Sequence, residues 1–276
     1  MRKKILCIYH GNCADGFTSA WIVRKMYPDA EFHAGFYNEP VPDVTDKIVY
    51  IVDFSYKLEI MKDLVKKALH VVHIDHHDTA IQDMAGYSDV NLEQIYSRQN
   101  TESGAMLTWK YFFPNREVPV IIRHVDDRDR WKFLIPGTRA ISENMFSYAY
   151  TFENWDMLMN KELDEQIRDG TAIERRMAKD VKELIGVVVR RMNIAGYNVP
   201  IANVTYQYGS ELCSALAKNE PFAGYYYDKP THREFGLRSA PGGVHVGKIA
   251  QLFGGGGHEN ASGFRRSFEE SKAFEV

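Results

Sequence analysis

Val71-Val72-His73-Ile74-Asp75-His76-His77-Asp78 is the stretch that decides the predicted fold. Its apolar half is typical of a parallel strand that is buried on both faces. Its polar half therefore lies just past the carboxyl end of that strand, where open α/β sheets bind their ligands. Carboxylate and neutral imidazole together suit a borderline divalent ion such as Mn²⁺, Fe²⁺ or Zn²⁺. A solvated turn is the alternative, and this stretch taken alone does not decide between them.

Two earlier apolar runs end in the same way. Residues 4–9 form a predicted first strand, which is followed by the turn His10-Gly11-Asn12-Cys13-Ala14-Asp15-Gly16 and a helix over residues 17–26. After a second predicted strand at 31–36, a third at 47–52 ends directly at Asp53 and precedes an amphipathic helix. This alternation predicts an α/β fold with a parallel, doubly wound sheet. In such a sheet the strand ends meet at one crevice, where we expect His10, Asp15, Asp53, Asp75, His76 and His77 to converge.

Two of these residues, and an acidic cluster later in the chain, also have plainer interpretations. His10 could cap or pack against the helix that follows it. Asp53 could cap the next helix, although Ser55 suits that role as well. The acids of Asp126-Asp127-Arg128-Asp129-Arg130-Trp131 could form a salt-bridged surface cluster.

Composition restricts the class of protein. The chain has 276 residues, 45% hydrophobic and 26% charged, which is enough for one large or two medium domains. A net charge of −3 and a pI of about 6.4 argue against a broad basic surface for long duplex nucleic acid. The three cysteines, Cys7, Cys13 and Cys213, form no CxxC pair. The apolar part of the N-terminal stretch is too short for a signal peptide or membrane span, so we expect a cytoplasmic protein without membrane contact.

The second half of the chain has a different pattern. Residues 142–189 are predicted to be mostly helical, with charged side chains at i,i+4 spacing. Short β-type runs follow at 199–206, 222–227 and 234–238, and then a helix at 244–253. We therefore predict an N-terminal domain over 1–150, a helical linker over 151–195 and a smaller α/β domain over 196–276.

A run of four glycines, Gly254-Gly255-Gly256-Gly257, precedes His258 in this last domain. Glycine allows close approach of the backbone to a ligand, and successive N–H groups can form an anion-binding nest. A phosphate cradle is favoured here, with Arg238 as a nearby source of charge, and a flexible hinge is the alternative.

The ordered set of motifs resembles the DHH phosphoesterases. Asp75-His76-His77 is similar to the motif that names the family, His10 to Gly16 resembles its first motif and Val52-Asp53-Phe54-Ser55 its second. Asp126 to Trp131 resembles the fourth motif. The run from Gly254 to His258, with Ala261-Ser262-Gly263-Phe264, resembles the glycine loop of the associated DHHA1 domain. The resemblance spans nearly the whole chain and is strongest to the nano-RNase, or oligoribonuclease, branch.

The resemblance implies a two-domain clamp with two divalent metal ions in the first domain. Mn²⁺ is the favoured ion, with Mg²⁺ or Co²⁺ as alternatives. The implied metal ligands are His10, Asp15, Asp53, His76 and one acid of the fourth motif, for which Asp127 is favoured and Asp129 is the rival. Asp75 would orient a ligand histidine, and His77 would face the scissile phosphate. Arg238, Gly255, Gly256, Gly257 and His258 would bind the substrate.

The first motif departs from the family pattern at one position. The family has two acids after the histidine, whereas Cys13 stands here where the first acid would be. A thiolate could ligate a softer metal, or Cys13 could be a bystander beside a weaker first site. The ligand set of that site is therefore left open.

The resemblance implies hydrolysis of short single-stranded oligonucleotides or linear dinucleotides to mononucleotides by a hydroxide that two metal ions activate. The alternatives are a phosphomonoesterase or phosphoanhydride hydrolase, acting on pAp, pyrophosphate or polyphosphate, and a non-catalytic nucleotide-binding module. A homodimer is left open.

Overall fold

The computed structural model describes residues 4–37 and 39–275 of the chain. Residues 1–3 of the N-terminal stretch lie outside these ranges. The chain divides into two compact units, Met1–Glu174 and Arg175–Val276. Their boundary falls inside the long helix α8 (Leu163–Val188), within the segment predicted to link two domains.

The first unit is built on a five-stranded sheet in which every neighbouring pair of strands is parallel. The strands lie in the order β2-β1-β3-β4-β5. Their bounds are β1 (Lys4–His10), β2 (Glu31–Gly35), β3 (Lys47–Val52), β4 (His70–Asp75) and β5 (Leu92–Tyr96). The α/β class and the parallel sheet predicted from the strand pattern are confirmed.

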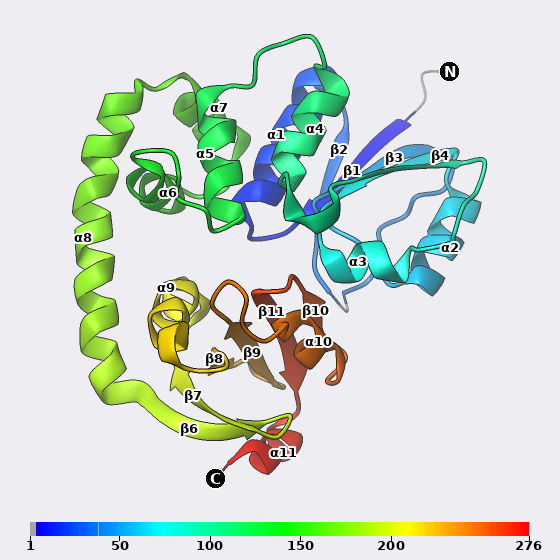
Figure 1. Cartoon of the computed structure of the whole chain (residues 1–276). Helices are drawn as coiled ribbons and strands as arrows, with labels where there is room; N and C mark the ends of the chain where they lie inside the picture. Colours follow the sequence, from blue (N-terminus) through cyan, green and yellow to red (C-terminus); the bar gives the residue numbers. More distant parts are fainter. Residues whose placement is uncertain (1–3, 38, 276) are drawn as a thin grey trace. The chain divides into compact units, whose positions relative to one another are not determined.

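Helices cover both faces of this sheet. Successive strand residues point to opposite faces, so neighbouring residues pack against different helices. On one face Ile51 and Val71 pack with the apolar stripe of α2 (Leu58–Lys67), which contains Met61, Leu64 and Val65. On the other face Val52 and Val72 pack with α1 (Ala14–Met26) and α4 (Gly104–Phe112). The helices α1 and α4 lie side by side on that face (Figure 1).

A helical layer extends the first unit beyond the sheet. It contains α5 (Val120–Asp129), α6 (Thr138–Phe146) and α7 (Phe152–Asn160). Large apolar side chains join these helices to α1 and α4, including Trp21, Trp109, Ile122, Met145 and Trp155. The layer matters for the site because it fixes the C-terminal end of α5 beside the first turn of α1.

Two elements of the first unit were not predicted. The short helix α3 (Asp78–Asp83) begins directly after His77, and β5 forms where the sequence pattern predicts no strand. All five residues of β5 are only half-buried, and its sequence Leu-Glu-Gln-Ile-Tyr has no continuous apolar run. An edge strand of this kind leaves little hydrophobic signal in the sequence.

The second unit contains a six-stranded mixed sheet in the order β10-β11-β9-β8-β7-β6. All its pairs are antiparallel except β7 with β8. The strands are β6 (Val189–Ile194), β7 (Tyr197–Asn203), β8 (Ala223–Asp228), β9 (Arg233–Arg238), β10 (Gly256–Gly257) and β11 (Ala261–Arg266). The helices are α9 (Tyr206–Leu216), α10 (Val246–Gln251) and α11 (Phe268–Ser271), and 3₁₀ turns lie at Arg98–Asn100, Ala217–Asn219 and Lys272–Phe274.

Two boundaries differ from the prediction in this region. Residues 189–194 form strand β6, although they fall in the segment 151–195 predicted as helical linker. The β-type run predicted over 199–206 ends at Asn203, and α9 follows it. Near the end of α8, Val181 packs in a core with Leu212 and Cys213 of α9. Among the described residues, no helix is both long and apolar enough to cross a membrane.

Candidate active site

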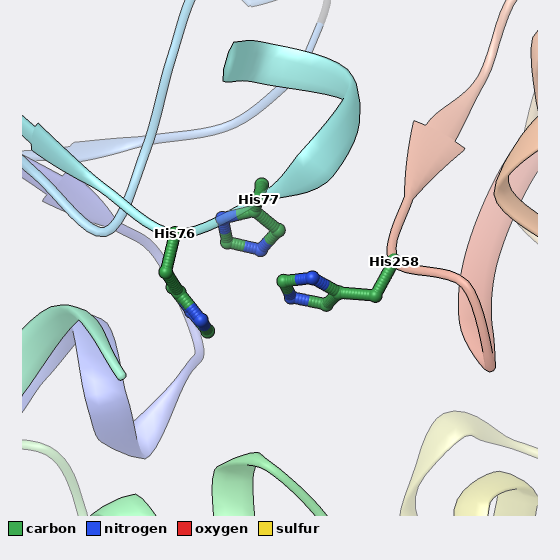
Figure 2. Close-up of side chains that lie close together, drawn as sticks. All are labelled: His76, His77 and His258. Carbon is green, nitrogen blue, oxygen red and sulfur yellow. The ribbon is translucent and has the colours of Figure 1, made fainter. Parts of the chain in front are cut away.

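The candidate site lies at the carboxyl ends of the parallel strands in the first unit. His10 ends β1, Asp53 directly follows β3 and Asp75 ends β4. His76 and His77 follow Asp75 and lead into α3 (Figure 2). The adjacency of β1, β3 and β4 in the sheet brings these residues together.

Asp53 is the centre of the site. Its Oδ1 lies 3.1 Å from Nε2 of His76, and its Oδ2 lies 3.6 Å from Nδ1 of His10. Asp53 is 1% exposed and has a φ of 55°, a left-handed conformation that is uncommon for a residue other than glycine. The backbone N–H of Asp53 still donates to the carbonyl of Ile74, so the turn is held by the neighbouring strand. Strained backbone of this kind is often found at functional sites.

His76 is oriented by Asn100, a residue that the sequence did not suggest. Nδ1 of His76 donates to Oδ1 of Asn100 at 2.9 Å, which directs Nε2 toward the carboxylates. Nε2 lies 3.4 Å from Oδ2 of Asp129 and 3.8 Å from Oδ2 of Asp15. Burial alone would lower the pKa of His76, but Asp129, Asp53 and Asp15 outweigh it and raise that pKa well above its usual value. In the metal-free protein the protonated ring is thus a counter-charge for three carboxylates.

Asp15 is held by the start of α4. Its Oδ1 accepts hydrogen bonds from the hydroxyl of Ser103 at 2.6 Å and from the backbone N–H of Ala105 at 3.1 Å. Gly104 lies so close that an added Cβ would be 2.5 Å from Cβ of Asp53 and 2.9 Å from Oδ2 of Asp15. Burial, together with the charges of Asp53 and Asp129, raises the pKa of Asp15 well above its usual value. The first turn of α4 therefore fits closely against the carboxylates.

Asp75 orients His77 rather than His76. Its Oδ1 accepts hydrogen bonds from Nδ1 of His77 at 2.7 Å and from the backbone N–H groups of His76 and His77. Burial alone would lower the pKa of His77, but the charge of Asp75 outweighs it and raises the pKa. The hydrogen bond through Nδ1 leaves Nε2 as the atom of His77 that can face a ligand.

His73, in β4, links β5 to the turn that follows β3 through both of its ring nitrogens. Its Nδ1 accepts from the hydroxyl of Tyr96 at 2.8 Å, and its Nε2 donates to the carbonyl of Phe54 at 3.0 Å. Phe54 directly follows Asp53, so this fully buried imidazole ties β4 and β5 to the turn that carries the central carboxylate. Its apolar neighbours had suggested only a strand residue.

The two acids considered for the fourth motif have different surroundings. Asp127 uses both carboxylate oxygens inside the fold, where they accept hydrogen bonds from the N–H groups of Leu134 and Ile135 and from the hydroxyl of Thr138. Asp129, one turn from Asp126 at the end of α5, is instead the acid beside His76. Asp129 therefore lies among the candidate ligands, whereas the Asp127 carboxylate is bonded elsewhere in the fold, and we favour Asp129 as the acid of the fourth motif. Sequence spacing could not separate them, because only the direction in which each side chain leaves the helix end distinguishes the two.

The site has four buried carboxylate oxygens without a hydrogen bond. Within residues 4–37 and 39–275, the Oδ2 atoms of Asp15, Asp53, Asp75 and Asp129 are buried and accept no hydrogen bond. Their nearest cationic groups are histidine nitrogens at 3.4–3.8 Å. Buried carboxylates are costly unless they are hydrogen-bonded, paired with a charge or bound to metal. Donor atoms in the sets His10/Cys13/Asp53 and Asp15/Asp53/His76 lie within 4.8 Å of one another. This mixture of oxygen and imidazole donors fits borderline divalent ions such as Mn²⁺, Fe²⁺ or Zn²⁺.

Cys13 is placed at the edge of this cluster. It is the N-cap residue of α1 and is half-buried. Burial and the charges of Asp53, Asp129 and Asp15 raise the pKa of its thiol well above the usual value, while the backbone N–H of Gly16 opposes the shift. Gly16 is required here, because an added Cβ would lie 2.4 Å from the carbonyl oxygen of His10. The first turn of α1 thus packs directly against His10.

The glycine run in the second unit forms a tight hairpin. Gly256 and Gly257 make up β10, and the N–H groups of Gly254, Gly255 and His258 donate to the carbonyls of Gln251, Ala250 and Ala261. An added Cβ on Gly255 would lie 2.1 Å from the carbonyl oxygen of Gly263. These three amides are used inside the chain, so the expected nest does not form from them. A role in substrate binding for Gly255, Gly256, Gly257 and His258 stays a prediction.

Arg238 is likewise held within the second unit. Its guanidinium donates to the hydroxyl of Ser210 at 2.8 Å and to the carbonyl of Leu237 at 2.8 Å. The side chain is half-buried, so part of it is open to a ligand. Its role in binding the substrate stays a prediction.

Comparison with known proteins supports the fold. No family model matches the chain. A protein of Acanthamoeba polyphaga mimivirus, uncharacterized protein R106, is 27% identical over 285 residues. That alignment covers 93% of this chain and 66% of the viral protein, so the chain spans just under two thirds of its relative.

Among solved structures, the pGpG-specific phosphodiesterase PggH from Vibrio cholerae matches with a TM-score of 0.52 at 13% identity. The match covers 98% of this chain and 95% of that protein, and it supports a shared fold along nearly the whole length. An exopolyphosphatase-related protein from Bacteroides fragilis matches with a TM-score of 0.45 at 15% identity, covering 98% of this chain and 89% of the other. This second likeness is too weak to support an argument.

Proposed function

We propose that the chain is a metal-dependent phosphodiesterase of the DHH type, which hydrolyses short oligonucleotides or linear dinucleotides to mononucleotides. The observation that carries the proposal is the cluster of four carboxylates (Asp15, Asp53, Asp75 and Asp129) and three imidazoles (His10, His76 and His77), which gathers where adjacent parallel strands end. Its carboxylate oxygens without hydrogen bonds and the strained backbone of Asp53 are features of a binding site rather than of a stabilising core.

The donors fall into two overlapping groups that share Asp53. His10 and Asp53 would hold one divalent ion, and Asp15, Asp53, His76 and Asp129 would hold the other. Divalent ions held by these residues would lower the pKa of a bound water and would supply positive charge near the oxygens of the phosphoryl group. Mn²⁺ is the favoured ion for the second group, whose donors are carboxylates and one imidazole.

The side chains of the protein position the ions and the substrate. Asn100 sets the tautomer of His76, and the start of α4 fixes Asp15. The Asp75 carboxylate keeps His77 protonated at Nδ1, so its Nε2 can donate a hydrogen bond to a phosphate oxygen or pass a proton to the leaving group. A DHH-type assignment also explains why a nucleophilic Ser or Cys is not required.

The substrate class follows from charge and from the structural likeness. With a net charge of −3 the chain does not favour long nucleic acid. The Vibrio protein of shared fold is specific for pGpG, a linear dinucleotide, which supports a small diester as the substrate. In this proposal Arg238 contacts a terminal phosphate or sugar of the substrate.

The proposal is tested with a panel of substrates incubated with the metal-loaded protein. We expect Mn²⁺-dependent release of mononucleotides from pGpG, pApA and end-labelled two- to five-mers, resolved over time. Hydrolysis confined to pAp, pyrophosphate or polyphosphate would indicate a phosphomonoesterase or phosphoanhydride hydrolase instead. Nucleotide binding without turnover of any member of the panel would indicate a binding module.

A further inference from the structure

We propose that the sulfur of Cys13 is a metal ligand and that, with His10 and Asp53, it forms a site that prefers a thiophilic cation such as Zn²⁺ or Co²⁺ to Mn²⁺ or Mg²⁺. This inference rests on the proposed function of the cluster, but it concerns a separate property, the identity of the ion in one half of the site. The two halves would then select different ions.

The donor geometry carries the inference. Sγ of Cys13, a ring nitrogen of His10 and a carboxylate oxygen of Asp53 all lie within 4.8 Å of one another. Bonds of about 2.3 Å from zinc to sulfur and about 2.0–2.2 Å to nitrogen or oxygen allow such atoms to share one ion. In the described part of the chain, Oδ2 of Asp53 and Nδ1 of His10 are buried and make no hydrogen bond. The thiol therefore lies beside two donors that make no hydrogen bond and that lie 3.6 Å from each other.

The backbone keeps these donors together. Asn12 has a φ of 55°, which turns the chain sharply between His10 and Cys13. The N–H of Phe17 donates to the carbonyl of Cys13 at 2.9 Å and anchors this residue at the start of α1. Gly16 lets the first helical turn approach the His10 backbone closely. Sulfur and imidazole are consequently held on a short turn whose ends are hydrogen-bonded to β2 and to α1.

The other two cysteines have a different explanation. Cys7 lies in β1 and packs in the apolar layer between the sheet and α1. Cys213 lies in α9 and packs in the apolar core of the second unit. Both are fully buried among hydrophobic side chains, so packing accounts for them. Cys13 alone of the three is placed against a carboxylate and an imidazole.

The chemistry of the donors sets the preference. Thiolate is a soft ligand that favours Zn²⁺ and similar ions, whereas Mn²⁺ and Mg²⁺ prefer carboxylate, carbonyl and water oxygens. Binding through sulfur forms a metal–sulfur bond and transfers the thiol proton to solvent, so uptake of the ion releases one proton. Asp15, Asp53, His76 and Asp129, which contain no sulfur, keep the harder preference of the second group.

The experiment is a Co²⁺ titration of the metal-free full-length protein, followed by absorbance. We expect a near-ultraviolet thiolate-to-cobalt charge-transfer band to grow with the first equivalent. The band should be lost in Cys13→Ser and retained in the matched control Cys213→Ser. Zn²⁺ affinity of Cys13→Ser should fall more than about tenfold, since even residues that only orient a ligand change metal affinity by about 10- to 100-fold. Its Mn²⁺ affinity should change much less.

A second variant separates ligand loss from misfolding. Cys13→Asp should restore first-site binding, now with Mn²⁺ preferred to Zn²⁺, and both Cys13 variants should keep the far-ultraviolet circular dichroism of the wild type. A wild-type protein without the charge-transfer band, or a band that survives in Cys13→Ser, would overturn the inference. Hydrolysis of dinucleotides by a protein without the band would overturn only the sulfur ligand. A band in a protein that hydrolyses no phosphoester would overturn only the proposed activity.

Discussion

The two sheets of this chain differ in where their charged side chains lie and in how those side chains are paired. In the first unit, acids and imidazoles gather at the carboxyl ends of parallel strands, are buried, and include oxygens without hydrogen bonds. In the second unit, charged residues of the largely antiparallel sheet pair along or across strands near the surface, as Arg233 does with Asp228 and Arg265 with Glu234. The first arrangement is unfavourable without a ligand, whereas the second is satisfied by the protein alone.

This difference follows from sheet topology. Parallel strands all end at the same edge, so residues that follow them are forced into one place. Neighbouring antiparallel strands end at opposite edges, so residues that follow them are separated. We therefore assign the chemistry to the first unit, and the predictions below test that assignment from the largest expected effect to the smallest.

Replacing Asp53 should have the largest effect. Asp53→Ala removes the carboxylate shared by both groups of donors, and we expect hydrolysis to fall by about three orders of magnitude or more. Asp63→Ala, which changes an exposed acid on α2, is the matched control and should be indistinguishable from wild type. Rates are measured with a dinucleotide under saturating metal. An Asp53→Ala protein that is folded and fully active would refute the metal-dependent mechanism.

Asn100 offers a test of positioning rather than of ligation. Asn100→Gly removes the acceptor that orients His76 but suits the local φ of 50°, so backbone strain is not added. We expect metal affinity to fall by about 10- to 100-fold. Gln99→Gly is the control, because Gln99 also has a positive φ, of 62°, but an exposed side chain. Equal affinities in the two variants would mean that the hydrogen bond to His76 has no influence on metal binding.

Arg238 tests whether the second unit contributes to substrate recognition. We expect Arg238→Ala to raise KM for a dinucleotide about tenfold, a loss of about 1.4 kcal/mol of binding. KM for a small chromogenic diester, which lacks a second nucleotide, should hardly change. Arg233→Ala, on the same strand and paired with Asp228, serves as the control. A similar rise for both substrates would argue against a role in gripping the far end of the substrate.

The pH dependence of stability should show the smallest effect. The raised pKa values of Asp15 and Asp129 mean that the folded, metal-free protein holds protons that the unfolded chain releases. Stability from these groups is lost as pH rises from the usual aspartate range, near 4, through their raised values. The raised pKa of His76 acts in the same direction, because its contribution is complete below about 6.5 and is lost as pH rises through the folded-state pKa.

The lowered pKa values of Asp53 and Asp75 do not change this trend near neutral pH. Their contributions are complete above the usual aspartate value and are lost only in stronger acid. We therefore expect Tm of the metal-free protein to fall by a few degrees between pH 5 and 8 and Mn²⁺ to reverse the fall. Thermal unfolding with and without chelator measures this. Asp129→Asn should flatten the metal-free curve, and an unchanged slope in that variant would contradict the role given to Asp129.

Much of the site could be predicted because its residues lie at strand ends. The apolar runs before Asp53 and Asp75 identified two strands, and their parallel arrangement required the residues that follow to meet. The positioning residues left no comparable signal. Asn100 and Ser103 follow a half-buried edge strand without clear periodicity, and Gly104 resembles any helix-opening glycine until its approach to Asp53 is seen.

The sequence by itself indicated the α/β class, the parallel sheet and most of the candidate ligands, because hydrophobic periodicity and the alternation of strands and helices along the chain are local properties. Only the tertiary structure showed that Asp129 rather than Asp127 lies beside His76 and that Cys13 lies against His10 and Asp53. It also showed that the amides of Gly254, Gly255 and His258 donate within a hairpin. These outcomes depend on the direction of each side chain and on contacts between distant segments, which a one-dimensional pattern does not specify.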